Sequence, residues 1–158
     1  MDIAAEILER LGADWLPAIY RDTVRPQRTR AYDLDVPPKE NAADILHTLL
    51  GIELKVGRNR FACPDLATAR YLRVFARLGC RRVAVPYDIT RISAIADILE
   101  TSWHRTLLYI ADATKHDSPQ ARGRKRSGIL RIMRDQITDI GAGDAMPAFK
   151  QSTSQRNR

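Results

Sequence analysis

The sequence predicts a small α+β fold, with a sheet of about three strands, a hairpin plus one, packed against three or four helices. Several segments carry apolar residues at helical spacing, whereas residues 52–56 alternate between apolar and polar side chains. The chain has 158 residues, of which 44% are hydrophobic. This is the composition of one globular domain, and a chain of this length folds without disulfides or a structural metal.

The N-terminal part, residues 1–36, is predicted to be a helix followed by a basic arm. Ile3, Ile7, Leu8 and Leu11 recur at helical spacing, and a glycine follows as a stop signal. Residues 13–36 include a proline and an arginine-rich stretch at 25–30, and no regular element is predicted there.

The central part, residues 37–113, is predicted to form the α+β core. A helix is expected over 38–50, after Pro37 and Pro38 and before Gly51. The alternation at 52–56, the turn residues 57–59 and the run 60–63 predict a β-hairpin. A helix over 64–78, a short strand over 82–85 and a long helix over 89–113 follow.

The C-terminal part, residues 114–158, is predicted to be a basic linker, a short amphipathic helix over 128–140, and a tail that is disordered on its own. Residues 114–127 are polar and basic, which is typical of a linker. The helix 128–140 also carries Arg131 and Arg134. Residues 141–158 have neither apolar periodicity nor much apolar mass.

The net charge of +7 is concentrated in two segments. Within the core, arginines recur on one side of the predicted helix, and a continuous basic strip is expected if the hairpin lies nearby; its members are Arg58, Arg60, Arg70, Arg73, Arg77, Arg81 and Arg82. The linker adds a second cluster of Arg122, Arg124, Lys125 and Arg126. Concentrated cations bind phosphates, although a solvated helix side shows the same pattern.

These clusters favour a non-enzymatic, cytoplasmic binding module that contacts nucleic acid or a nucleic-acid-containing assembly. An acidic protein surface is the alternative partner for the same arginines. The apolar stripe of helix 128–140, with Ile129, Met133 and Ile137, supports a third hypothesis. In that hypothesis the chain is an adaptor whose helix docks on a partner protein, unless the helix packs on its own domain.

An enzymatic alternative comes from Glu53-Leu54-Lys55, preceded by Asp44. This run resembles the active-site motif of PD-(D/E)xK nucleases. The resemblance implies that Asp44 and Glu53 hold Mg²⁺ and that Lys55 helps to activate water. The family carries its aspartate on a strand after a proline, whereas residues 40–50 have helical periodicity here and Ala43 precedes Asp44.

No other cofactor or metal site is predicted. The cysteines, Cys63 and Cys80, and the three scattered histidines match no zinc-ligand spacing. The longest apolar run, residues 107–111, is too short to cross a bilayer, and no membrane partner is expected. Acidic residues near the N-terminus do not fit a secretory signal, so a cytoplasmic location is expected.

Overall fold

A computed structural model describes residues 2–143 and confirms a small α+β fold. The helices are α1 (Ile3–Leu11), α2 (Leu16–Ile19), α3 (Leu66–Leu78), α4 (Ile89–Ala113) and α5 (Pro119–Ile140). The strands are β1 (Thr29–Asp33), β2 (Ala43–Thr48), β3 (Gly51–Val56), β4 (Asn59–Cys63) and β5 (Arg82–Pro86). The short helical turns Gly12–Asp14 and Tyr20–Val24 flank α2.

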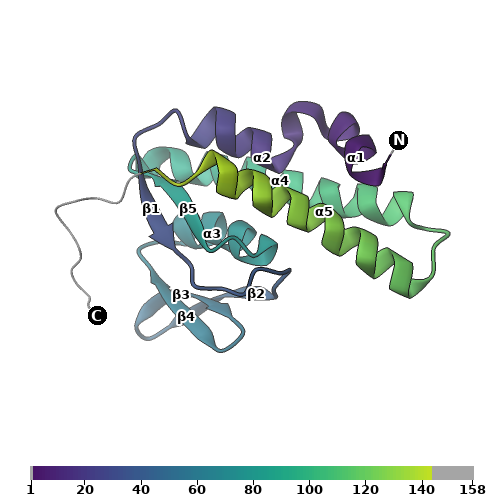
Figure 1. Ribbon diagram of the computed structural model, residues 1–158. Helices are drawn as coiled ribbons and strands as arrows, with labels where there is room; N and C mark the ends of the chain where they lie inside the picture. The colour runs from purple at the N-terminus through teal and green to yellow at the C-terminus, as the bar shows by residue number, and fades with distance from the viewer. Residues whose placement is uncertain (1, 144–158) are drawn as a thin grey trace.

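The strands form two antiparallel sheets, where the sequence predicted a single one. β2, β3 and β4 form a three-stranded meander, and β5 pairs with β1. The predicted hairpin and the strand at 82–85 are thus confirmed as β3, β4 and β5. Figure 1 shows α3 between the meander and the layer of α1, α2, α4 and α5.

The helix predicted over 38–50 is wrong, because residues 43–48 form strand β2. Ala43 is buried and Ile45 packs against the core, while Asp44 between them is exposed. The apolar residues of this segment satisfy both a helical and an alternating pattern, and pairing with β3 selects the strand. Leu49, which is spaced from Ile45 and Leu46 as on one face of a helix, is fully exposed in the β2–β3 turn.

The helices α3 and α4 begin and end close to where the sequence predicts. The Asp65 side chain accepts a hydrogen bond from the Thr68 amide, which caps the start of α3. Gly79 ends this helix in the left-handed conformation, with φ of 89°. The Asp88 side chain caps the 25-residue helix α4 in the same way.

Helix α5 is longer than predicted, because residues 119–127 of the expected linker belong to it. Ser118 caps its first turn, and Pro119 occupies a position where its missing N–H costs nothing. Its buried side chains are Ile129, Leu130, Met133 and Ile137, which join the main core. Residues 144–158, most of the predicted tail, lie outside the described residues.

Two partly buried hydrogen bonds fix the C-terminal half of α5 and the residue after it to the rest of the chain. The Tyr20 hydroxyl donates to the Gly141 carbonyl and accepts from the Ala84 amide, each at 2.8 Å. The Trp15 indole N–H donates to the Gln136 side chain at 2.7 Å. Within residues 2–143, no helix is long and apolar enough to span a membrane.

Candidate nucleic-acid interface

The arginines of α3, which are Arg70, Arg73 and Arg77, hold this helix against α4 and β2. Arg70 binds Asp97 and Glu100 of α4, and Arg73 binds Glu100 at 3.2 Å. Burial alone would raise the pKa of Glu100, but hydrogen bonds from Arg70 and Arg73 outweigh it and hold that pKa below its ordinary value. Arg77 donates to the Ala43 carbonyl at 3.2 Å.

The predicted strip of seven arginines therefore separates into three groups. The first is the α3 group, which the acidic side of α4 and the backbone of β2 occupy. Arg58 and Arg60 lie at the β3–β4 hairpin, where Arg60 pairs with Glu53 at 3.3 Å. Arg81 and Arg82 lie at the start of β5. Arg81 is 3.7 Å from the exposed Asp35, and Arg82 is 3.8 Å from the exposed Asp33.

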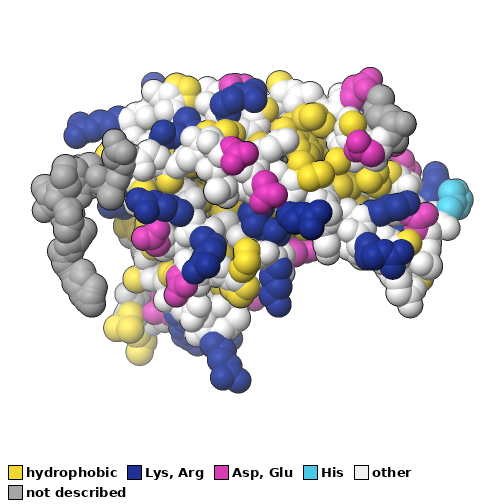
Figure 2. Space-filling model, in the orientation of Figure 1, with side chains coloured by type: hydrophobic (Ala, Val, Ile, Leu, Met, Phe, Trp, Pro, Cys, Tyr) yellow, Lys and Arg dark blue, Asp and Glu magenta, His cyan; other side chains and the backbone are white. Residues whose placement is uncertain are grey.

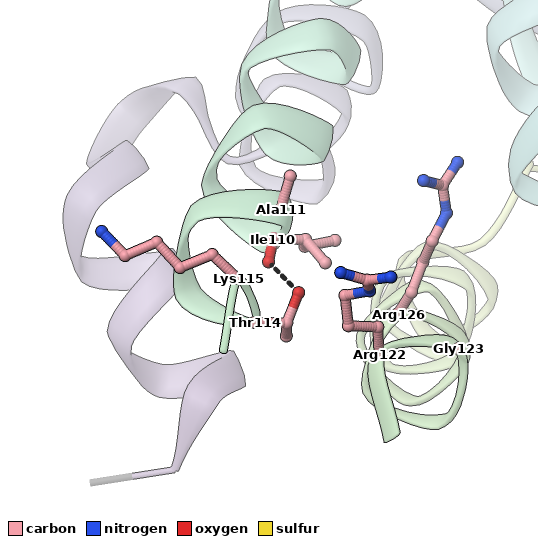
Figure 3. Close-up of a pocket in the computed structure, with 7 residues that line it drawn as sticks. All are labelled: Ile110, Ala111, Thr114, Lys115, Arg122, Gly123 and Arg126. Carbon is pink, nitrogen blue, oxygen red and sulfur yellow. Dashed lines mark hydrogen bonds between the residues drawn. The ribbon is translucent and has the colours of Figure 1, made fainter. Parts of the chain in front are cut away.

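The second predicted cluster lies on the first turns of α5. Arg126 forms an ion pair with Glu40, and Lys125 forms one with Asp117 at 2.7 Å. Arg122 lines a hollow of about 370 Å³ together with Lys115 and residues at the end of α4 (Figure 3). Cations beside the carbonyl end of a helix stabilise its dipole, so this hollow has a structural explanation.

A larger hollow of about 830 Å³ lies between α5 and the loop that precedes β2. Its cationic side chains are Lys39 on the loop and Arg124, Arg131 and Arg134 on the helix. A second hollow, of about 480 Å³, adds Arg81 and Arg82 at the far end of α5. Pro38 and Arg134 line both hollows, so the two lie next to one another along α5, and we call them together the α5 groove.

The α5 groove is positively charged. Six cations line it, against Glu40, which Arg126 already neutralises, and Asp135. Across residues 2–143, no acidic side chain forms an ion pair with Lys39, Arg124, Arg131 or Arg134. Arg134 donates through Nε to the Leu78 carbonyl at 2.9 Å, which holds its guanidinium at the centre of the groove. Figure 2 shows Lys and Arg side chains along α5 on this face, with acidic ones between them.

The loop wall of the groove is held rigidly against the end of α3. The Asn41 side-chain amide donates to the carbonyls of Pro37, Lys39 and Ala76. Gly79 lies so close that a Cβ there would be 2.3 Å from the Lys39 carbonyl oxygen. Since the backbone of Lys39 is fixed, its ammonium group projects from a defined position.

Lys39 was not predicted as a site residue, because it stands alone in the sequence between prolines and an acidic residue and belongs to neither basic cluster. The structure adds Arg131 and Arg134 to the site, which the sequence placed on the amphipathic helix 128–140 but in neither basic cluster. The proline pair before Lys39 was the available signal, since it favours an extended segment.

The nuclease-like residues share one face of the meander. Asp44 lies directly opposite Lys55 in the β2–β3 register, and Glu53 points to the same side. Glu53, however, is paired with Arg60, and β5 belongs to the other sheet. The described part of the chain contains no cluster of three or more His, Cys, Asp or Glu that could hold a metal.

The side chains proposed for partner docking are not accessible. Ile129, Met133 and Ile137 are each at most 1% exposed, because α5 packs on its own domain. The two cysteines are also buried as free thiols, and burial raises the pKa of Cys80 to about 12.

No family model, curated protein or solved structure matches this chain.

Proposed function

We propose that this protein is a non-enzymatic module that binds nucleic acid through the α5 groove. The observation that carries the proposal is the convergence of cations from three segments, the loop before β2, α5 and the start of β5, on one groove. Four of these cations are not neutralised by described acidic side chains. Their charge is therefore available to phosphates.

Arginine suits this task, because its planar guanidinium offers two parallel hydrogen bonds to a phosphate. If the four unpaired cations each neutralise one phosphate, log K should fall with log salt at a slope of roughly −3.6 for duplex DNA. An acidic protein partner would use the same cations. If the partner were an acidic protein, however, this protein would not bind unrelated nucleic-acid sequences with this salt dependence.

The test uses fluorescence polarisation with a labelled duplex of about 20 base pairs, titrated at several salt concentrations. The variant Lys39→Gln/Arg124→Gln/Arg131→Gln removes three exposed cations of the groove and leaves Arg134 in place. We expect its salt slope to fall from roughly −3.6 to roughly −1, and its affinity at low salt to fall by more than about 30-fold.

The matched control is Arg30→Gln/Arg58→Gln/Arg60→Gln, which removes the same charge from β1 and the β3–β4 hairpin, at residues that do not line the α5 groove. This control should retain most of the affinity and the salt slope. Equal losses in the two triple variants would show that only net charge matters, and would overturn the assignment to the groove. Absence of salt-dependent binding by the unmodified protein would overturn the proposed function itself.

A second candidate function is metal-dependent cleavage of phosphodiesters at Asp44, Glu53 and Lys55. The observation that favours it is the position of Asp44 on a strand opposite Lys55, as the resemblance to PD-(D/E)xK nucleases requires. Incubation of plasmid with the purified protein and Mg²⁺ tests this candidate. Cleavage that Glu53→Gln abolishes would support it, while absent cleavage, or cleavage that survives this change, would refute it.

A further inference from the structure

We infer that the α5 groove receives one sugar-phosphate backbone of a double helix, and that it does so without reading the base sequence. The inference rests on the proposed function and narrows it to a class of nucleic acid. It depends on three features of the groove: its lining, its length, and the rigid backbone that carries its cations.

The lining of the groove has no platform on which separated bases could stack. None of the residues that line either hollow is aromatic. Single-strand binding proteins combine cations with aromatic side chains on which the bases stack. Without such side chains, a single strand would be held by its phosphates alone and would still have to be ordered, which costs conformational entropy.

The length of the groove suits the regular backbone of a duplex. From Arg124 to Gly141, α5 advances about 25 Å at 1.5 Å per residue. Because a strand winds around the duplex axis, its successive phosphates lie about 6–7 Å apart along the strand, so this length spans roughly four phosphates. One helix holds the backbone positions of Arg124, Arg131 and Arg134 at a fixed spacing, which favours a ligand with a regular backbone over a flexible one.

The floor of the groove allows close approach of a backbone but offers few groups that read bases. Gly123, Ser127 and Gly128 present little side-chain bulk between the cations. Gln120 and Thr138 are the longer uncharged polar side chains of the lining. Contacts to phosphates position a duplex but carry no sequence information, so affinity should be similar for unrelated duplexes.

The density of phosphate charge gives the expected size of the preference. Counterion release gives a slope of about −0.9 per contact for a duplex and about −0.7 for a single strand. With four contacts, this difference corresponds to roughly tenfold tighter binding of a duplex at about 50 mM salt.

The experiment compares a duplex of about 20 base pairs, a second duplex of shuffled sequence, and a single strand of the same length. All three are titrated against the full chain from about 50 to 300 mM salt. We expect the two duplexes to bind within about twofold of one another, and the single strand roughly tenfold more weakly at the lowest salt.

The outcomes separate this inference from the proposed function. Equal or tighter binding of the single strand overturns the duplex preference and leaves nucleic-acid binding in place. A large difference between the two duplexes overturns binding without sequence readout. If neither form binds in a salt-dependent way, the proposed function fails and the inference fails with it.

Discussion

Replacement of Gly79 by alanine should disturb the end of α3 and the wall of the α5 groove together. Gly79 has φ of 89°, a conformation that alanine adopts only at a cost. The added Cβ would lie 2.3 Å from the carbonyl oxygen of Lys39 and 2.6 Å from its nitrogen. These are backbone atoms, so the contact is relieved only if the loop before β2 moves.

The expected loss of stability has two parts. The left-handed conformation costs alanine about 1–2 kcal/mol, partly offset by about 0.4–1 kcal/mol from the reduced entropy of the unfolded chain. Moving the loop also weakens the hydrogen bonds of Asn41, each worth about 1 kcal/mol. Together these effects predict a loss of about 3 kcal/mol, or a Tm lower by roughly 6–12 °C.

Gly57→Ala is the matched control, because Gly57 has φ of 60° and nothing within 4 Å of its added Cβ. It should lose about 1 kcal/mol by the conformational cost alone. Urea denaturation followed by circular dichroism measures both values. Equal losses in Gly79→Ala and Gly57→Ala would refute the close approach of the loop to α3. The groove should also lose affinity for duplex only in Gly79→Ala, since only this change displaces Lys39.

Two further predictions concern the packing of the helices. Glu100→Gln should destabilise the protein by about 1–2 kcal/mol at neutral pH, because it weakens the ion pairs with Arg70. The lowered pKa of Glu100 means that these pairs contribute fully above about pH 4.5 and are lost as the pH falls through the folded-state pKa. The urea midpoints of Glu100→Gln and of the unmodified protein should therefore approach each other as the pH falls below about 4.5. A difference that stays constant with pH would contradict the ionic explanation. Met133→Ala should cost about 2–5 kcal/mol, because this side chain is fully buried; an unchanged urea midpoint would instead mean that α5 does not pack on its own domain in solution.

Local signals in the sequence were sufficient for elements bounded by strong caps. Asp65 and Gly79 delimit α3, and Asp88 marks the start of α4, as the structure confirms. The hairpin of β3 and β4 was likewise predictable from alternation and turn residues. In each case the residues that decide the structure are neighbours in the chain.

Elements that depend on distant partners could not be predicted in this way. β1 pairs with β5, about 50 residues later. Three of its five side chains are partly buried and two are exposed, so its sequence shows little apolar alternation. β2 was mistaken for a helix because its pairing with β3, rather than its own pattern, determines its conformation. The first turns of α5 are polar because the groove exposes them, and they therefore resembled a linker.

The candidate site shows the same division between local and distant information. The regular arginine spacing on α3 predicted a binding surface, but Glu100 on α4 binds two of these arginines. Glu100 lies 30 positions after Arg70 and 27 positions after Arg73 in the chain. Lys39 and Arg131 belong to no predicted cluster, yet with Arg124 they line one groove without an acidic partner among residues 2–143. Whether a cation supports the fold or is available to a ligand depends on the acids of the element packed against it. Periodicity within one helix does not contain that information. Of the predicted residues, Arg81, Arg82 and Arg124 line the α5 groove, whereas the regularly spaced arginines of α3 do not.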